Sequence, residues 1–311
     1  MELPLADVPE PDASLEPEGY MVGGGSGDRI HFLDWGGPAD ASGRPGIVAV
    51  HGLRQTGWIW APVARRLGGA RGRRHVVTMD LRGHGLSDAP TEDDAYDLDL
   101  QADDVVAVAE GAGLLDAPGD RVVLAGHGFG AIVAAHAAAD LHERCAGLVL
   151  VDGGWEALEP ATGVDADEFL REVDEPPEVM RSMAAFLADR KGFDPSTWDA
   201  DQQRAARTEV VETHAGRVVP SARPHATEAS TRAMFTYDPA VTLAALDAPV
   251  LALVAADDET GTRAVALAVA TAARLAAGRS EIEVVAFDGV GHNLMRYRPR
   301  EVAAALLALT A

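Results

Sequence analysis

Short apolar runs alternate with longer helical patterns along most of this chain, and that alternation constrains the fold more than any other feature. The runs are rich in Val, Leu and Ala without regular polar interruptions, which is typical of strands buried on both faces of a sheet. Helical patterns between consecutive strands indicate crossover connections, so we expect an α/β fold with a mostly parallel sheet and helices on both faces. The predicted strands are Arg29–Trp35, Gly46–Val50, His75–Asp80, Arg121–Gly126, Gly147–Asp152, Pro249–Ala255 and Ile282–Phe287, and the predicted helices are about Ala61–Leu67, Leu100–Ala112, Phe129–Leu141, Arg263–Ala277 and Arg300–Leu309.

The interval from Gly153 to Arg232 breaks this rhythm. It is acidic, helical in pattern and punctuated by proline, and it contains no convincing buried strand. Such a length is too great for a connecting loop. We therefore predict a helical cap over residues 153–232, inserted into a core formed by residues 19–152 and 233–311. The first 18 residues are acidic and rich in Pro, and we expect them to be a flexible leader.

The charge of the chain limits its partners. A net charge of −23 repels nucleic acid and anionic membrane surfaces. No apolar run reaches the roughly 18 residues of a membrane span, and the N-terminus lacks the basic and apolar regions of a secretory signal. Neither a phosphate-binding loop nor a metal-ligand spacing occurs. We expect a cytoplasmic protein with a small-molecule substrate and no cofactor, metal, membrane or nucleic-acid partner; a homodimer stays open.

A strand, a Gly-rich turn and a helix meet in the sequence LAGHGFGA, residues Leu124–Ala131. Such a turn usually presents a reactive side chain at its centre. Here the central residue is Gly128, which has no side chain. Glycine tolerates the unfavourable backbone angles of this turn, so loss of a side chain there is expected to leave the fold intact.

Four stretches in one order, from about Tyr20 onward, resemble the α/β-hydrolase fold family. They are VAVHGLRQTGW, MDLRGHGLSD, LAGHGFGA, and the pair formed by ADDE and DGVGHNLMRYRP. The resemblance implies an α/β-hydrolase core with an inserted cap. In the family pattern G-x-S-x-G, Gly126 and Gly130 match, while Gly128 stands in the place of the nucleophilic Ser.

The resemblance also implies roles for other residues. His292, in the loop after the last strand, corresponds to the catalytic base. Its acid partner is expected to be Asp258, with Asp257 as the close alternative and Asp152, at the end of an earlier strand, as an outside candidate. The N–H groups of Leu53 and Phe129 correspond to the oxyanion hole. Structural roles are expected for His51 and for the segment from Asp80 to Ser87, with Arg82 paired locally; Trp58, Trp60, His127 and Trp155 are candidates to line the substrate pocket.

Three functional hypotheses follow from Gly128. In the first, the chain is a hydrolase of a small, apolar ester or lactone that has lost its nucleophile, and is inactive or weakly active. In the second, it is a cofactor-independent enzyme, such as a lyase, cyclase, oxygenase or water-activating hydrolase, in which His292 is the general base. In the third, it binds a small molecule without catalysis. Haloalkane dehalogenation and ordinary epoxide hydrolysis are disfavoured, because both normally require a carboxylate at this turn.

Overall fold

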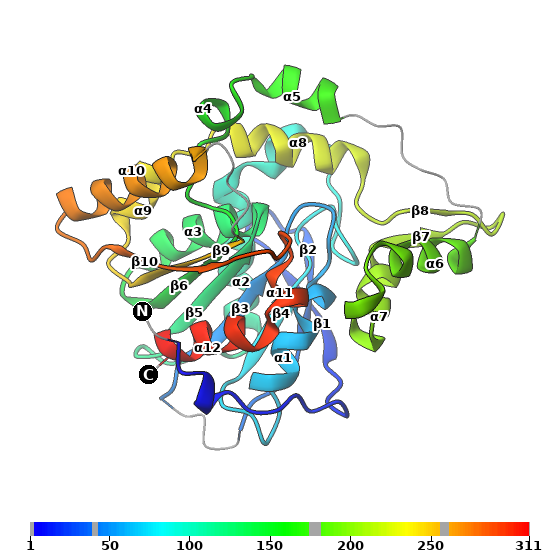
Figure 1. The fold of residues 1–311 in the computed structure, drawn as a ribbon, viewed down its shortest axis with the longest axis horizontal. Helices are drawn as coiled ribbons and strands as arrows, with labels where there is room; N and C mark the ends of the chain where they lie inside the picture. The colour runs from blue at the N-terminus through cyan, green and yellow to red at the C-terminus, as the bar shows by residue number, and fades with distance from the viewer. Residues whose placement is uncertain (1–2, 39–42, 174–181, 256–260, 311) are drawn as a thin grey trace.

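The centre of the molecule is an eight-stranded sheet in the order β1-β2-β4-β3-β5-β6-β9-β10 (Figure 1). The structure is a computed structural model that describes residues 3–38, 43–173, 182–255 and 261–310. The pairs β1–β2 and β2–β4 are antiparallel, and the other neighbouring pairs are parallel. All seven predicted strands are present in this sheet, and its eighth strand, β1 at one edge, was not predicted. The bounds are β1 Glu18–Gly23, β2 Arg29–Asp34, β3 Gly46–Val50, β4 Val76–Met79, β5 Val122–His127, β6 Cys145–Val151, β9 Val250–Ala255 and β10 Ile282–Phe287.

Helices cover both faces of this sheet and bury two separate cores. Along β3, Ile47 and Ala49 point into one core, whereas Val48 and Val50 point into the other. This alternation follows from the two-residue period of a strand, and it explains the continuous apolar runs in the sequence. One core is covered by α1 Ala61–Leu67, α11 Leu294–Tyr297 and α12 Pro299–Leu309; the other is covered by α2 Leu98–Gly111, α3 Phe129–Leu141, α9 Pro239–Ala245 and α10 Thr262–Ala276.

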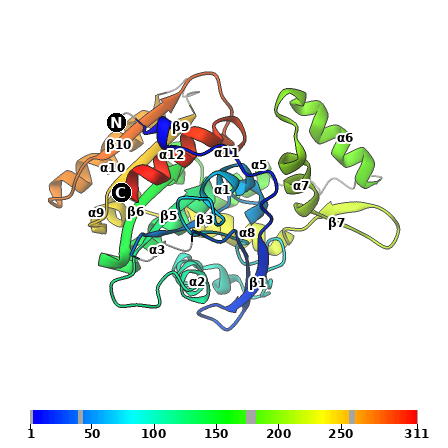
Figure 2. The same ribbon diagram turned by 90° about the horizontal axis from the view of Figure 1, so that it is seen from below.

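The segment between β6 and α9 forms two groups of elements. Helices α4 and α5 pack on α8, while α6 packs on α7 beside a small hairpin (Figures 1 and 2). The hairpin was not predicted, because each of its strands has only three residues. Helix α8 continues past the predicted boundary at residue 232 and ends at Phe235. The bounds are α4 Leu158–Thr162, α5 Ala166–Val173, α6 Met183–Phe193, α7 Ala200–Thr208, β7 Val210–Glu212, β8 Val218–Pro220 and α8 Pro224–Phe235.

The leader packs against the core, contrary to the expectation that it is flexible. Val8 is buried in the same core as α1 and α12. The backbone N–H of Asp12 donates to the carbonyl of Arg65 at 2.8 Å, and the Arg65 guanidinium pairs with Glu16 at 3.0 Å. The acidic, Pro-rich composition suggested too little burial for order. Composition alone does not show that a few apolar side chains and the buried Arg65 hold the segment in place.

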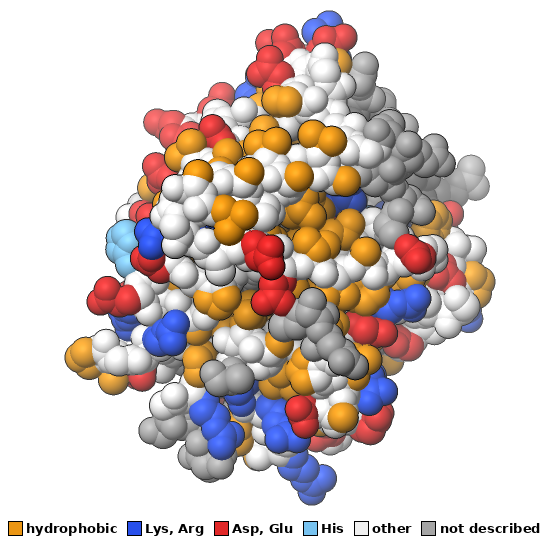
Figure 3. All heavy atoms as spheres, turned by 60° about the vertical axis from the view of Figure 1, so that its left-hand side comes forward, with side chains coloured by type: hydrophobic (Ala, Val, Ile, Leu, Met, Phe, Trp, Pro, Cys, Tyr) orange, Lys and Arg blue, Asp and Glu red, His pale blue; other side chains and the backbone are white. Residues whose placement is uncertain are grey.

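Among the described residues, no helix is long and apolar enough to cross a membrane. The helices α9 and α10 expose hydrophobic side chains, and Figure 3 brings the side of the molecule that carries them forward. The most exposed of these side chains are Val241, Val265, Val269 and Leu275.

Candidate active site

Gly128 lies at the junction of β5 and α3 with φ 53° and ψ −116°, a conformation that L-amino acids rarely adopt. Its N–H donates to the carbonyl of Val151 at 3.1 Å. At the nearby Gly130, an added Cβ would lie 2.3 Å from the carbonyl oxygen of His51, so a side chain there is sterically excluded. At Gly128, the nearest atom to an added Cβ is Nε2 of His292, at 3.3 Å. A small side chain at position 128 would thus point at His292, and it would fit if the imidazole moved by a few tenths of an ångström and the turn kept its strained φ.

His292 lies in the loop between β10 and α11, where its imidazole contacts Asp152. Nδ1 of His292 lies 2.6 Å from Oδ2 of Asp152. Because a carboxylate accepts, Nδ1 carries the hydrogen, and Nε2 keeps a lone pair on the side of Gly128. The Asp152 side chain is 2% exposed, whereas the His292 side chain is 61% exposed. An exposed imidazole fixed by a buried carboxylate is the arrangement of a general base.

Asp152 is held in its ionised form by several contacts. Its Oδ1 accepts the backbone N–H of Ala255 at 2.9 Å and lies 2.9 Å from Nη1 of Arg263. Burial of Asp152 raises its pKa, but the hydrogen bond from His292, the charge of Arg263 and the Ala255 N–H together hold that pKa below its ordinary value. Asp152 also has φ 50°, an unusual angle for a residue other than glycine that is often found at functional sites.

The structure thus pairs His292 with the carboxylate that was the outside candidate in the sequence. The favoured acid Asp258 and its alternative Asp257 lie outside the described residues. Nδ1 of His292 is already occupied by Asp152, so the position expected for Asp258 is taken. Arg263, at the start of α10, was not recognised from the sequence. The sequence around an arginine near a helix start does not indicate which carboxylate that arginine contacts.

A second histidine supports the first. His127, at the end of β5, lies 3.0 Å from Oε1 of Gln55 through Nδ1 and 3.1 Å from the carbonyl of His292 through Nε2. Burial and the neighbouring His292 lower the pKa of His127 to about 3, so its ring is uncharged at neutral pH. The Gln55 oxygen also accepts the N–H of Gly52. The uncharged ring carries one N–H, so His127 donates to only one of these two oxygens and contacts the other, between the loop after β3 and the loop that carries His292.

The two residues expected to supply oxyanion donors line the same pocket as Gly128. Leu53 follows β3, Phe129 is the first residue of α3, and both line the pocket at Gly128. Within the described residues, the N–H groups of Leu53 and Phe129 donate to no acceptor. The Phe129 N–H also lies at a helix N-terminus, where the helix dipole favours negative charge. Both groups are thus available to a ligand oxygen.

A pocket of about 310 Å³ opens over Gly128. His127 lines it, as predicted, together with Gly52, Asp152 and His292. The three tryptophans that were expected there lie elsewhere: Trp60 and Trp155 are buried in the two cores, and Trp58 packs edge-on against Trp35. Their apolar area is buried within the fold. The apolar part of the pocket wall is formed by Leu53, Phe129, Ile132, Leu158 and Met234, the last two from α4 and α8.

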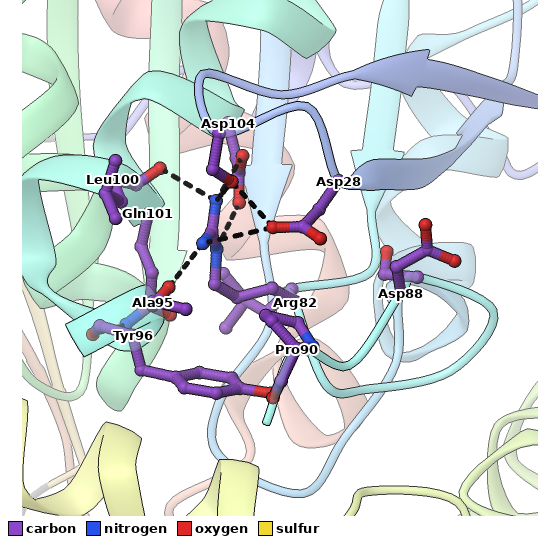
Figure 4. A network of polar contacts seen from close by, with 12 residues as sticks. Asp28, Arg82, Asp88, Pro90, Ala95, Tyr96, Leu100, Gln101 and Asp104 are labelled. Atoms are coloured by element: carbon purple, nitrogen blue, oxygen red, sulfur yellow. Dashed lines mark hydrogen bonds and ion pairs between the residues drawn. The ribbon is translucent and has the colours of Figure 1, made fainter. Parts of the chain in front are cut away.

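The segment from Asp80 to Ser87 has the structural role that was expected of it. Arg82 is fully buried and forms two hydrogen bonds of 2.8 Å with the equally buried Asp104 of α2 (Figure 4). His84 lies 3.0 Å from the carbonyl of Arg82 and accepts the N–H of Arg54, and burial lowers its pKa to about 3. The ring nitrogens of His51 contact the carbonyl of Gly52 and the N–H of Leu81. These contacts hold the loop after β4 against α2 and against the loop after β3. Within the described ranges, no cluster of three or more His, Cys, Asp or Glu side chains could hold a metal ion.

Known proteins with partial similarity include several hydrolases. Epoxide hydrolase 4 of Mus musculus is 30% identical over 123 residues, which are 40% of this chain and 31% of that protein. Lipase LipV of Mycobacterium tuberculosis is 32% identical over 172 residues, which are 54% of each protein. These matches span at most about half the length of the two curated relatives.

Solved structures match over nearly the whole chain. The crystal structure of E-2-(acetamidomethylene)succinate hydrolase has a TM-score of 0.74 and 22% sequence identity, and the match covers 94% of this chain and 98% of that one. At this identity the likeness concerns the fold, an α/β-hydrolase fold with a mostly parallel central sheet. The family described as "Alpha/beta hydrolase family" matches residues 47–305, from β3 to α12. Because that match covers most of the chain, the protein belongs to the alpha/beta hydrolase family.

Proposed function

We propose that the protein is a hydrolase of small, mostly apolar esters or lactones whose nucleophile position is vacant, so that it is weakly active as it stands. The observation that carries the proposal is the 3.3 Å between an ideal Cβ on Gly128 and Nε2 of His292. A serine there would place its hydroxyl within hydrogen-bond reach of a base that Asp152 already orients. The esterase, lipase and epoxide hydrolase names among its relatives support hydrolysis as the reaction class.

The remaining groups support a slow reaction without a covalent intermediate. Nε2 of His292 removes a proton from a water molecule that attacks the substrate carbonyl. The N–H groups of Leu53 and Phe129 stabilise the oxyanion, and the protonated His292 then returns the proton to the leaving group. Positioning and the oxyanion hole can retain about 10³- to 10⁴-fold of acceleration when a triad member is absent.

The test is hydrolysis of p-nitrophenyl butyrate by a series of variants. We expect Gly128→Ser to raise turnover at least about a hundredfold, because it restores the nucleophile. Gly128→Ala carries the same backbone strain without a hydroxyl and should stay at the level of the unmodified protein. Adding His292→Ala to Gly128→Ser should remove the gain, whereas adding His214→Ala, a histidine of the cap outside the pocket, should not. No gain with serine would refute the proposal.

One observation favours a second candidate, proton abstraction from the substrate itself. Within the described residues, Nε2 of His292 makes no hydrogen bond, and His292 lines the pocket at Gly128. A base in that position can act on an acidic C–H or O–H group of a bound carbonyl compound. The unmodified protein would then exchange deuterium into such a compound, and His292→Ala would abolish the exchange. Failure of Gly128→Ser to hydrolyse the ester would favour this second candidate.

A further inference from the structure

A second pocket, of about 350 Å³, also has His292 in its lining. His292 and Gln55 line both pockets, so the two cavities meet at the catalytic imidazole. Gly128 and Phe129 line only the first one. The histidine of such a site donates a proton to the leaving group, so that group must depart on the side of the imidazole. The second pocket is placed to receive it.

The second pocket differs from the first in its chemistry. Its walls come from α6, α7 and the segment between them in the cap, and from α11 and its neighbours in the core. Phe193, Trp198 and Tyr297 supply aromatic surface, and Arg190 and Arg296 supply positive charge. The chain as a whole has a net charge of −23, so the two arginines give this lining a charge opposite to that of the molecule.

The two arginines have different surroundings. Arg296 donates to Oγ1 of Thr197 at 2.6 Å and to the carbonyl of Asp194 at 2.9 Å, and the nearby carboxylate of Asp194 offsets part of its charge. Arg190 is exposed, lies 5.2 Å above the ring of Phe186, and forms no ion pair within the described residues. The guanidinium of Arg190 is therefore free to bind an anion.

Glu209 is the acidic side chain in this lining. Its carboxyl makes no hydrogen bond or ion pair within the described residues. Burial raises the pKa of Glu209 to about 7, although Arg190 and Arg54 act in the opposite direction. A carboxyl that is half protonated near neutral pH can donate a hydrogen bond to an anion instead of repelling it.

We propose that the second pocket is the leaving-group subsite and that it takes an aromatic leaving group bearing a carboxylate, which Arg190 binds. The inference deepens the proposed function by narrowing it to esters with an apolar acyl part, since a lactone releases no separate leaving group, and it rests on that function for the assignment of the leaving-group side. The ring would lie among the aromatic side chains, and the carboxylate would meet Arg190 with a hydrogen bond from protonated Glu209.

Binding to the unmodified protein tests this proposal without requiring turnover. We expect 4-hydroxybenzoate to bind, by isothermal titration calorimetry, about tenfold more tightly than the neutral 4-hydroxybenzyl alcohol or the cationic tyramine. Arg190→Gln should remove that preference, whereas the matched variant Lys191→Gln, on the adjacent exposed residue, should keep it. Equal binding of the three compounds, or no binding of 4-hydroxybenzoate, would overturn the proposal.

The pH dependence provides an independent arm. Lowering the pH from 8 to 6 should tighten 4-hydroxybenzoate binding, because Glu209 becomes neutral. Arg190, Arg296 and Arg54 stay charged throughout, and any share due to His292 is isolated by repeating the titration with His292→Ala. Glu209→Gln should bind at pH 8 as tightly as the unmodified protein does at pH 6. If the unmodified protein prefers tyramine and Glu209→Gln removes that preference, the pocket binds cations, and the proposed site for an anionic leaving group is refuted. Failure of Gly128→Ser to hydrolyse esters would leave these binding results unaffected, so the two proposals fail separately.

Discussion

Replacing Asp152 by Asn in the Gly128→Ser variant is the sharpest test of the acid. Oδ2 of Asp152 accepts from His292 at 2.6 Å, and Oδ1 faces two donors, Ala255 N–H and Arg263 Nη1. Asn offers only one oxygen. If that oxygen stays with Ala255 and Arg263, the amide NH₂ faces Nδ1 of His292, which must then accept. The ring hydrogen moves to Nε2, and the base is lost.

The expected loss in kcat is about 10³- to 10⁴-fold. That corresponds to an increase of about 4 to 5.5 kcal/mol in the activation free energy. Ester hydrolysis measures the rate, and ¹⁵N shifts of the His292 ring report the tautomer without depending on turnover. Asp257→Asn and Asp258→Asn are the matched controls and should keep both the rate and the tautomer. If Asp258→Asn removes activity while Asp152→Asn does not, the assignment of Asp152 is wrong.

Two further predictions concern stability. Arg82→Met leaves Asp104 buried without its partner and should lower the unfolding free energy, measured by urea denaturation, by about 3 to 5 kcal/mol. The double variant Arg82→Met, Asp104→Leu should recover much of this loss. Equal stability of the single and double variants would contradict the prediction. His84 and His127 have a folded-state pKa of about 3, below the unfolded value of 6.5, so the unfolded chain binds more protons as the pH falls and stability is lost below about pH 6.5. Each contributes up to about 1.4 kcal/mol per pH unit, so His84→Asn should lose less stability between pH 7 and 5 than the exposed control His214→Asn.

The fold could be predicted because its signals are local. The apolar runs of β3, β5 and β6 carry side chains into both cores, so they are unbroken in the sequence. Strand β1 was missed because most of its residues are exposed, which leaves no such run. The packing of the leader was missed for a different reason. It depends on Arg65 of α1, about fifty positions away, and composition alone does not reveal a contact between residues so far apart.

The site was predicted in part, and the choice of acid shows the limit. Strands β6 and β9 are parallel neighbours, with Val151 opposite Leu253. Their carboxyl ends therefore lie at the same edge of the sheet, and a carboxylate after either strand can approach a histidine from the loop after β10. The spacing of Asp152 and Asp258 in the sequence is compatible with both pairings. The decision rests on Arg263 and the Ala255 N–H, which hold Asp152 in place and which only the folded chain brings together.

The shape of the turn at Gly128 does not depend on the residue at its centre. Gly130 is required there because a side chain would meet the carbonyl of His51, and Gly153 is required because its Cβ would lie 2.8 Å from Cα of Gly128. Strand β5 and helix α3 fix the two ends of the turn, and its N–H is bound to Val151. Loss of the side chain at position 128 therefore removes a reactive group without removing the geometry that would hold it. For this reason a single Gly128→Ser change is expected to restore function without any compensating change elsewhere, provided that His292 yields the few tenths of an ångström that the 3.3 Å contact requires.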